Sequence, residues 1–63
     1  MTSLKRQYKY HEPDLYGDGT YSCELLERDE HGEWKAVART PRVRTQRGAI
    51  LLAREWVDRR EAS

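Results

Sequence analysis

The last third of the sequence constrains the fold more than any other part. From Thr45 to Glu61 the segment TQRGAILLAREWVDRRE repeats apolar residues at helical spacing. At about 100° per residue, the apolar side chains fall within one arc of roughly 160°, the width of the stripe that a core-facing helix buries. They are Ala49, Ile50, Leu52, Ala53, Trp56 and Val57. Thr45 can cap the first turn, because its hydroxyl can accept a backbone N–H two or three residues on. The sequence therefore predicts a C-terminal helix that buries one face.

The residues before this helix alternate with a period of two, as in β-strands. Along residues 20–27 three side chains share one face of an extended chain: Tyr21, Cys23 and Leu25. A polar turn at 29–33 contains Gly32, which can take positive φ, and residues 34–39 are predicted to return as the second strand of a hairpin. Residues 7–10 can add a third strand. We predict an α+β fold of order β-β-β-α, in which one C-terminal helix packs on a three-stranded antiparallel sheet.

The returning strand, residues 34–39, has no clear buried face. Strict alternation divides its side chains into two sets: Trp34, Ala36 and Ala38 against Lys35, Val37 and Arg39. Each set mixes small or aliphatic residues with an aromatic or charged one. The alternation alone therefore leaves the inward face of this strand open.

The length of 63 residues predicts one small domain, spanning 1–63 with an ordered core at about 7–60. A core of this size supplies roughly 3–5 kcal/mol of stability, which makes self-association a reasonable expectation. The longest apolar run, residues 49–53, is far shorter than the about 20 residues of a membrane span. No apolar segment typical of a secretory signal follows the amino-terminal cations, and a single cysteine cannot form a disulfide within the chain. These features favour a cytoplasmic location and no membrane partner.

Charge is unevenly distributed along the chain although the net charge is only +1. Residues 12–33 are strongly acidic, whereas residues 34–47 contain five cations and no acid: Lys35, Arg39, Arg42, Arg44 and Arg47. Cations on a strand, a loop and a helix start can match the spacing of phosphates on duplex DNA, and arginine can read guanine bidentately. We therefore take these five residues as a candidate nucleic-acid-binding surface and duplex DNA as the expected partner.

The acidic and basic blocks also permit a different interpretation. They can face each other within the fold, or pair between chains in a protein-interaction or self-assembling module, with another protein or a second copy as partner. Leu51 falls opposite the apolar stripe of the predicted helix, near Arg47 and Asp58. It is the large apolar residue that the helix is expected to expose, and so the candidate interface residue.

A family resemblance covers residues 19–57. The order of strand, Gly-containing turn and strand, followed by VRTQRGAILLAREWV, resembles the arm-type, AP2-like DNA-binding domains of phage and transposon tyrosine integrases. Thr45, Ala49 and Trp56 match the family's helix-opening Thr, inner Ala and later Trp, whereas Gly48 stands where an acid often precedes that Ala. The resemblance implies a sheet that enters the major groove, with Lys35, Arg39, Arg42 and Arg44 on its reading face. Short phage and actinobacterial proteins also look similar in shape.

Catalytic and metal sites are not expected. The soft metal ligands are His11, Cys23 and His31, whose separations match no compact zinc spacing. No Gly-rich phosphate loop follows a strand and opens a helix, because Gly48 stands alone. The sequence thus favours a noncatalytic binding module without a cofactor.

Overall fold

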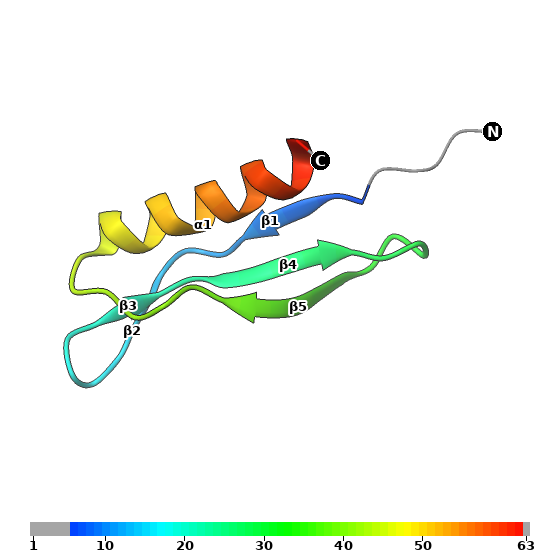
Figure 1. Ribbon diagram of the computed structural model, residues 1–63. Coiled ribbons are helices and arrows are strands. Elements are labelled where there is room, and N and C mark those ends of the chain that lie inside the picture. The colour runs from blue at the N-terminus through cyan, green and yellow to red at the C-terminus, as the bar shows by residue number, and fades with distance from the viewer. Residues whose placement is uncertain (1–5, 63) are drawn as a thin grey trace.

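The structure is a computed structural model that describes residues 6–62. Within this range five short strands precede one long helix (Figure 1). In chain order the elements are β1 (Tyr8–Tyr10), β2 (Asp14–Leu15), β3 (Tyr21–Ser22), β4 (Glu24–Arg28), β5 (Trp34–Arg39) and α1 (Gln46–Ala62). In the described range, α1 is not long and apolar enough to cross a bilayer.

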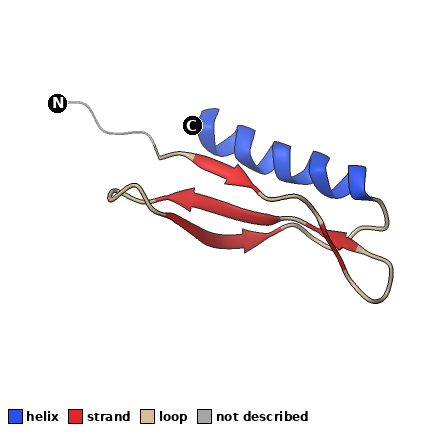
Figure 2. Ribbon diagram, turned by 180° about the vertical axis from the view of Figure 1, so that it is seen from behind, coloured by secondary structure: helices blue, strands red, loops and turns tan. Residues whose placement is uncertain are grey.

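The main sheet is antiparallel and has the strand order β1-β4-β5. α1 runs along β1, and β5 lies on the far side of the sheet (Figures 1 and 2). The predicted α+β fold, with a three-stranded antiparallel sheet and a C-terminal helix, is confirmed. The two outer strands of the sheet differ: α1 contacts β1, whereas no described strand pairs with the outer edge of β5.

A second sheet, β2-β3, is an addition to that prediction. The predicted strand 20–27 divides at Cys23, and its first part pairs with β2 through Asp14 and Ser22 instead of joining the main sheet. The connecting turn has Gly19 at a φ of 83°, and the Asp18 carboxylate accepts the Thr20 N–H at 3.1 Å. This local turn folds the chain back on itself and creates the extra pair of strands.

The core lies between α1 and the sheet. Cys23, Leu25, Ala49 and Ala53 are its buried members, and larger side chains are packed against them: Tyr10, Tyr21, Val43, Ile50 and Trp56. The rings of Tyr8 and Trp56 meet edge to face with their centroids 5.5 Å apart. The predicted inward faces of residues 21–25 and of the helix are thus confirmed. Leu51 is 53% exposed, also as predicted.

The start of α1 follows the predicted cap. The Thr45 hydroxyl accepts the Gly48 N–H at 3.0 Å, which satisfies one of the helix's unpaired amide groups. A Cβ on Gly48 would lie 2.8 Å from the Thr45 Oγ1 atom and 3.4 Å from the Val43 side chain. Glycine at position 48 therefore allows the capping loop to pack closely on the first helical turn.

An irregularity in β5 decides which side each of its residues faces. Leu25 pairs with Ala38 and Leu26 pairs with Ala36, so Val37 is an extra residue that has no partner on β4. Such a β-bulge resets the alternation of side chains. The expectation that strict alternation holds through residues 34–39 is therefore wrong.

Cross-strand partners share a face of the sheet, so the pairing defines two sides. Tyr8 contacts α1 and is in register with Glu27, which pairs with Lys35, so these three residues belong to the helix side. We call the other side the open face. Its members, on either side of the bulge, are Lys9, Glu24, Leu26, Arg28, Trp34, Ala36 and Arg39.

Candidate nucleic-acid interface

The five cations predicted to form one surface do not all lie on one side of the molecule's main sheet. Lys35 lies on the helix side of β5, whereas Arg39 belongs to the open face, because the bulge separates them. Arg42 and Arg44 lie in the connection to α1, and Arg47 is in its first turn; all three are exposed. The prediction of a continuous strand, loop and helix-start surface therefore requires revision.

Three of these cations face carboxylates of the acidic block. The Lys35 Nζ atom is 3.5 Å from Asp29, and an Arg39 Nη2 atom is 2.5 Å from Asp14. Arg42 and Asp18 approach within 3.6 Å. Within residues 6–62, Arg44 and Arg47 have no carboxylate at ion-pair distance. The two blocks thus compensate each other inside one chain, as the alternative interpretation of the charge pattern allows.

Tyr16 organises two of these arginines. The Arg42 guanidinium lies 3.8 Å from the centre of the Tyr16 ring, and Arg39 donates a hydrogen bond to the Tyr16 hydroxyl at 2.9 Å. Stacking on an aromatic ring and pairing with a carboxylate are both favourable for a guanidinium, and here they act together. Both side chains are therefore committed to contacts within the chain.

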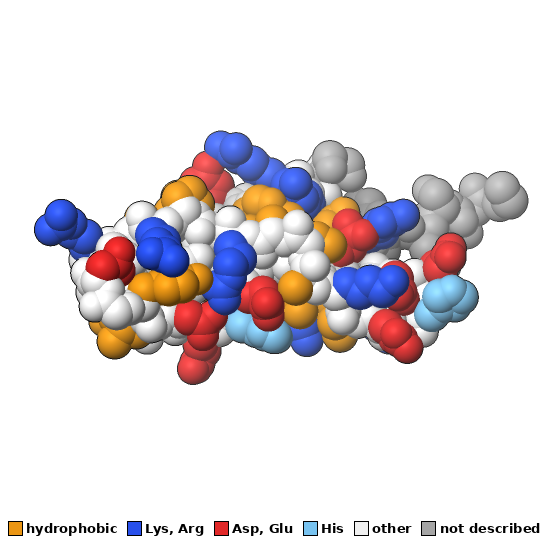
Figure 3. All heavy atoms as spheres, turned by 90° about the horizontal axis from the view of Figure 1, so that it is seen from below, with side chains coloured by type: hydrophobic (Ala, Val, Ile, Leu, Met, Phe, Trp, Pro, Cys, Tyr) orange, Lys and Arg blue, Asp and Glu red, His pale blue; other side chains and the backbone are white. Residues whose placement is uncertain are grey.

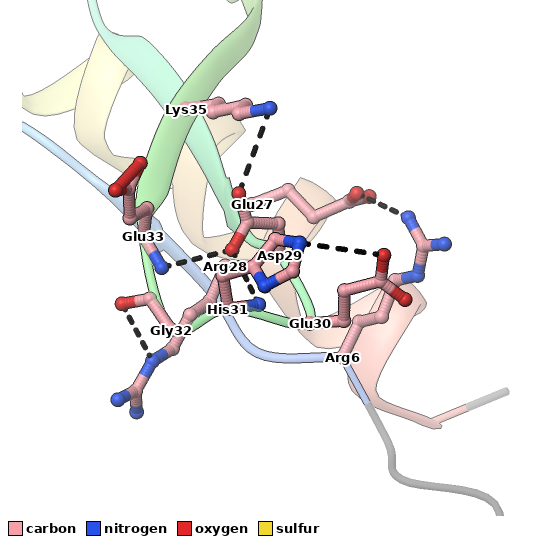
Figure 4. A network of polar contacts seen from close by, with 9 residues as sticks. All are labelled: Arg6, Glu27, Arg28, Asp29, Glu30, His31, Gly32, Glu33 and Lys35. Carbon is pink, nitrogen blue, oxygen red and sulfur yellow. Dashed lines mark hydrogen bonds and ion pairs between the residues drawn. The ribbon is translucent and has the colours of Figure 1, made fainter.

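The polar turn between β4 and β5 holds a second group of charges (Figure 4). Gly32 has a φ of 83°, as predicted, and the Asp29 carboxylate accepts the backbone N–H groups of His31 at 2.8 Å and of Glu33 at 2.9 Å. The hydrogen bond from Glu33, aided by that from His31 and by the charge of Lys35, holds the pKa of Asp29 below its ordinary value. The turn thus depends on an ionised Asp29.

We expect the stability of the fold to depend on this ionisation. The folded protein binds the Asp29 proton less readily than the unfolded chain, so the carboxylate stabilises the fold above its ordinary pKa of 3.8. This contribution is lost as the pH falls through the lowered pKa of the folded state. In thermal melts at stepped pH, the gap in Tm between wild type and Asp29→Asn should be constant above about pH 5 and narrow below it. A gap that does not change down to pH 2 would contradict this role.

The open face carries cations that the sequence analysis did not select. Lys9 lies with its Nζ atom 4.4 Å from the centre of the Trp34 ring, and Arg28 donates to Gln7 Oε1 at 2.8 Å and to the Gly32 carbonyl at 3.2 Å. Neither cation has a carboxylate at ion-pair distance within the described residues. The alternation of residues 7–10 was visible in the sequence, but the register against β4 was not.

The charges on the side of the molecule that is lowermost in Figure 1 are mixed. Blue and red side chains alternate along its length in Figure 3, with orange apolar patches between them. This view contains no extended area of a single charge sign. A candidate interface with phosphates must therefore be sought on a smaller surface than the one predicted.

Cys23, His11 and His31 lie in three different settings in the structure. Burial raises the pKa of the Cys23 thiol, which keeps it in the unreactive protonated form. Within residues 6–62 no group of three or more His, Cys, Asp or Glu residues is placed to hold a metal ion. His11 instead contacts Glu24 at 3.2 Å, and His31 lies in the exposed turn.

Comparisons with known proteins give no further guide to the site. No protein-family model, curated protein or solved structure matches the chain.

Proposed function

We propose that the protein is a small noncatalytic module that binds duplex DNA through the open face of its main sheet. The observation that carries the proposal is the arrangement of Lys9, Arg28 and Arg39 on the face of the main sheet opposite α1. The resemblance to arm-type DNA-binding domains supports binding through a sheet, although Arg39 is the one residue of its implied reading face that belongs to the open face. The proposed surface differs from the predicted one, because its three cations lie on the same face of the main sheet.

The dimensions of the sheet suit this function. Neighbouring strands lie about 4.8 Å apart, so the β4-β5 pair is narrow enough for a major groove about 12 Å wide. The hairpin projects beyond the end of α1 in Figure 1, so the helix does not flank its outer part. A groove-binding ribbon needs such an unobstructed approach.

The two unpaired cations of the open face are held in place by neutral groups. Gln7 and Gly32 orient the Arg28 guanidinium without neutralising it, and the Trp34 ring supports the Lys9 ammonium. Their positive charge thus stays available to phosphates, and the guanidinium stays available to a guanine edge. Arg39 adds a third positive group, which must exchange part of its contact with Asp14 for a phosphate.

The test compares two double variants with the same change in charge. Lys9→Gln with Arg28→Gln removes the unpaired cations of the open face. Lys35→Gln with Arg54→Gln removes one cation from the helix side of β5 and one exposed cation from α1. We expect the first variant to bind a labelled 20-base-pair duplex about tenfold more weakly than wild type, and the second less than about twofold. The slope of log binding constant against log salt concentration should also become shallower in the first variant only, by the amount expected for the loss of about two phosphate contacts.

Two results would oppose the proposal. Wild-type protein that does not bind the duplex at low salt would remove DNA as the partner. Equal losses in both double variants would show that binding follows the overall charge and that the open face has no special part. Circular dichroism of each variant verifies that the fold is retained.

A further inference from the structure

The β2-β3 hairpin places carboxylates against two arginines of the predicted DNA-binding surface. Residues 12–20, which include β2 and the turn before β3, contain three carboxylates and no cation. The Asp14 carboxylate lies 2.5 Å from the Arg39 Nη2 atom. The Asp18 carboxylate lies 3.6 Å from the Arg42 Nη1 atom. Each arginine therefore already contacts an anionic oxygen of the kind that a DNA phosphate would offer.

Tyr16, between the two carboxylates in the sequence, brings these contacts together. Its ring centre is 3.8 Å from the Arg42 guanidinium, and its hydroxyl accepts a hydrogen bond from Arg39 Nη1 at 2.9 Å. Both terminal nitrogens of Arg39 thus have acceptors in the hairpin, Asp14 and Tyr16. A guanidinium binds a phosphate or a guanine edge through a pair of such N–H groups. The hairpin therefore occupies the donors that Arg39 would use on DNA.

Backbone contacts, rather than these ion pairs, fix the position of the hairpin. The Tyr21 N–H donates to the Val43 carbonyl at 2.6 Å, and the Val43 N–H donates to the Tyr21 carbonyl at 3.0 Å. Tyr21 also packs against the buried core. β3 is thereby held beside the connection from β5 to α1 (Figure 1). Neutralising the carboxylates should therefore release the arginines without moving the hairpin.

The two ion pairs are exposed, so a competing anion can reach them. The exposed fraction of the side chain is 39% for Arg39 and 59% for Asp14, and it is 56% for both Arg42 and Asp18. Ion pairs at such positions are weak and are screened by salt. A duplex offers a dense row of phosphates that can replace the two carboxylates. The hairpin contact should therefore reduce the affinity for DNA without abolishing it.

From these contacts we propose that the β2-β3 hairpin is an autoinhibitory element of the DNA-binding surface, in which Asp14 and Asp18 hold Arg39 and Arg42 until phosphates displace them. This inference rests on the proposed binding of duplex DNA and concerns its regulation. Arg42 joins the binding surface when its carboxylate is displaced, because it shares the Tyr16 side chain with Arg39.

The test neutralises the two carboxylates and compares the result with an equal change in charge elsewhere. Asp14→Asn with Asp18→Asn keeps the side-chain oxygen through which residue 18 accepts the Thr20 N–H. Asp58→Asn with Glu61→Gln removes two exposed carboxylates from α1. At one salt concentration, we expect the hairpin variant to bind a labelled 20-base-pair duplex about tenfold more tightly than wild type. The α1 variant should gain less than about threefold.

The same changes in a second background separate local release from overall charge. When Arg39→Gln and Arg42→Gln are already present, the hairpin variant should gain no more than the α1 variant, because no arginine remains to be released. Two results would overturn the inference while leaving the proposed function intact. One is an equal gain in the hairpin and α1 variants, and the other is a hairpin gain of the same size in both backgrounds.

NMR of the arginine side chains tests the contact in the absence of DNA. The Nε–H signals of Arg39 and Arg42 in the free protein should shift in the hairpin variant and stay in place in the α1 variant. Unchanged signals in the hairpin variant would overturn the inference whether or not the protein binds DNA. If the signals shift but neither wild type nor the hairpin variant binds the duplex, the proposed function fails, and the hairpin contact is structural only.

Discussion

Leu25→Ala is expected to leave the protein mostly unfolded at 25 °C. Leu25 is 2% exposed and is the largest of the fully buried side chains in the described range, where it contacts the core formed with Ala49 and Ala53. Truncating a buried leucine costs about 2–5 kcal/mol, because apolar contact is lost and a cavity remains. A domain of this size has only roughly 3–5 kcal/mol of stability in total, so one such cavity removes most of it.

Urea and thermal denaturation followed by circular dichroism measure this effect. Leu15→Ala is the matched control, since Leu15 is 65% exposed and its truncation should change the free energy of unfolding by less than about 0.5 kcal/mol. A cooperative unfolding transition near that of wild type in Leu25→Ala would mean that the core is not centred on this residue.

Thr40→Val is expected to destabilise the fold by about 1–3 kcal/mol, although the two side chains have nearly the same shape. The buried Thr40 hydroxyl accepts the Cys23 N–H at 2.9 Å, and its oxygen lies 3.4 Å from the Ser22 hydroxyl. Valine fills the same space but leaves the Cys23 N–H without an acceptor. The cost comes from this unsatisfied buried donor rather than from a change in packing.

Two measurements distinguish a lost hydrogen bond from lost packing. Thr40→Ser keeps the hydroxyl and removes one methyl group, so it should cost less than about 1 kcal/mol. Amide hydrogen exchange at Cys23 should become faster in Thr40→Val relative to the neighbouring core amides and stay slow in Thr40→Ser. If Thr40→Val were as stable as wild type, water or backbone movement would have to satisfy the Cys23 amide.

Local sequence patterns predicted the elements that depend on local spacing. The apolar stripe at 49–57, the Thr45 cap, the Gly32 turn and the exposed Leu51 are each determined by residues a few positions apart. A helix or a tight turn requires no knowledge of distant segments, and its sequence signals are therefore direct. The fold class followed from the order of these elements.

The candidate site was less predictable because it depends on register. Lys9 and Arg28 share a face only through the alignment of β1, β4 and β5, which joins residues far apart in the sequence. The bulge at Val37 has no distinctive residue to reveal it, and it moved Lys35 to the other side of the sheet from Arg39. Likewise Ser22 alternates as a polar residue should, yet it is 1% exposed and donates to the Thr40 carbonyl at 2.7 Å.

The extra residue in β5 also affects how this protein can diverge among its descendants. Positions 34 and 36 belong to one surface and position 38 to the other, although all three lie on a strand of six residues. A mutation at position 34 or 36 therefore alters the open face, whereas a mutation at position 38 alters the helix side. Gain or loss of a single residue there would exchange the two surfaces along half of the strand, so selection on insertions and deletions should be stronger at this point than in the neighbouring turn.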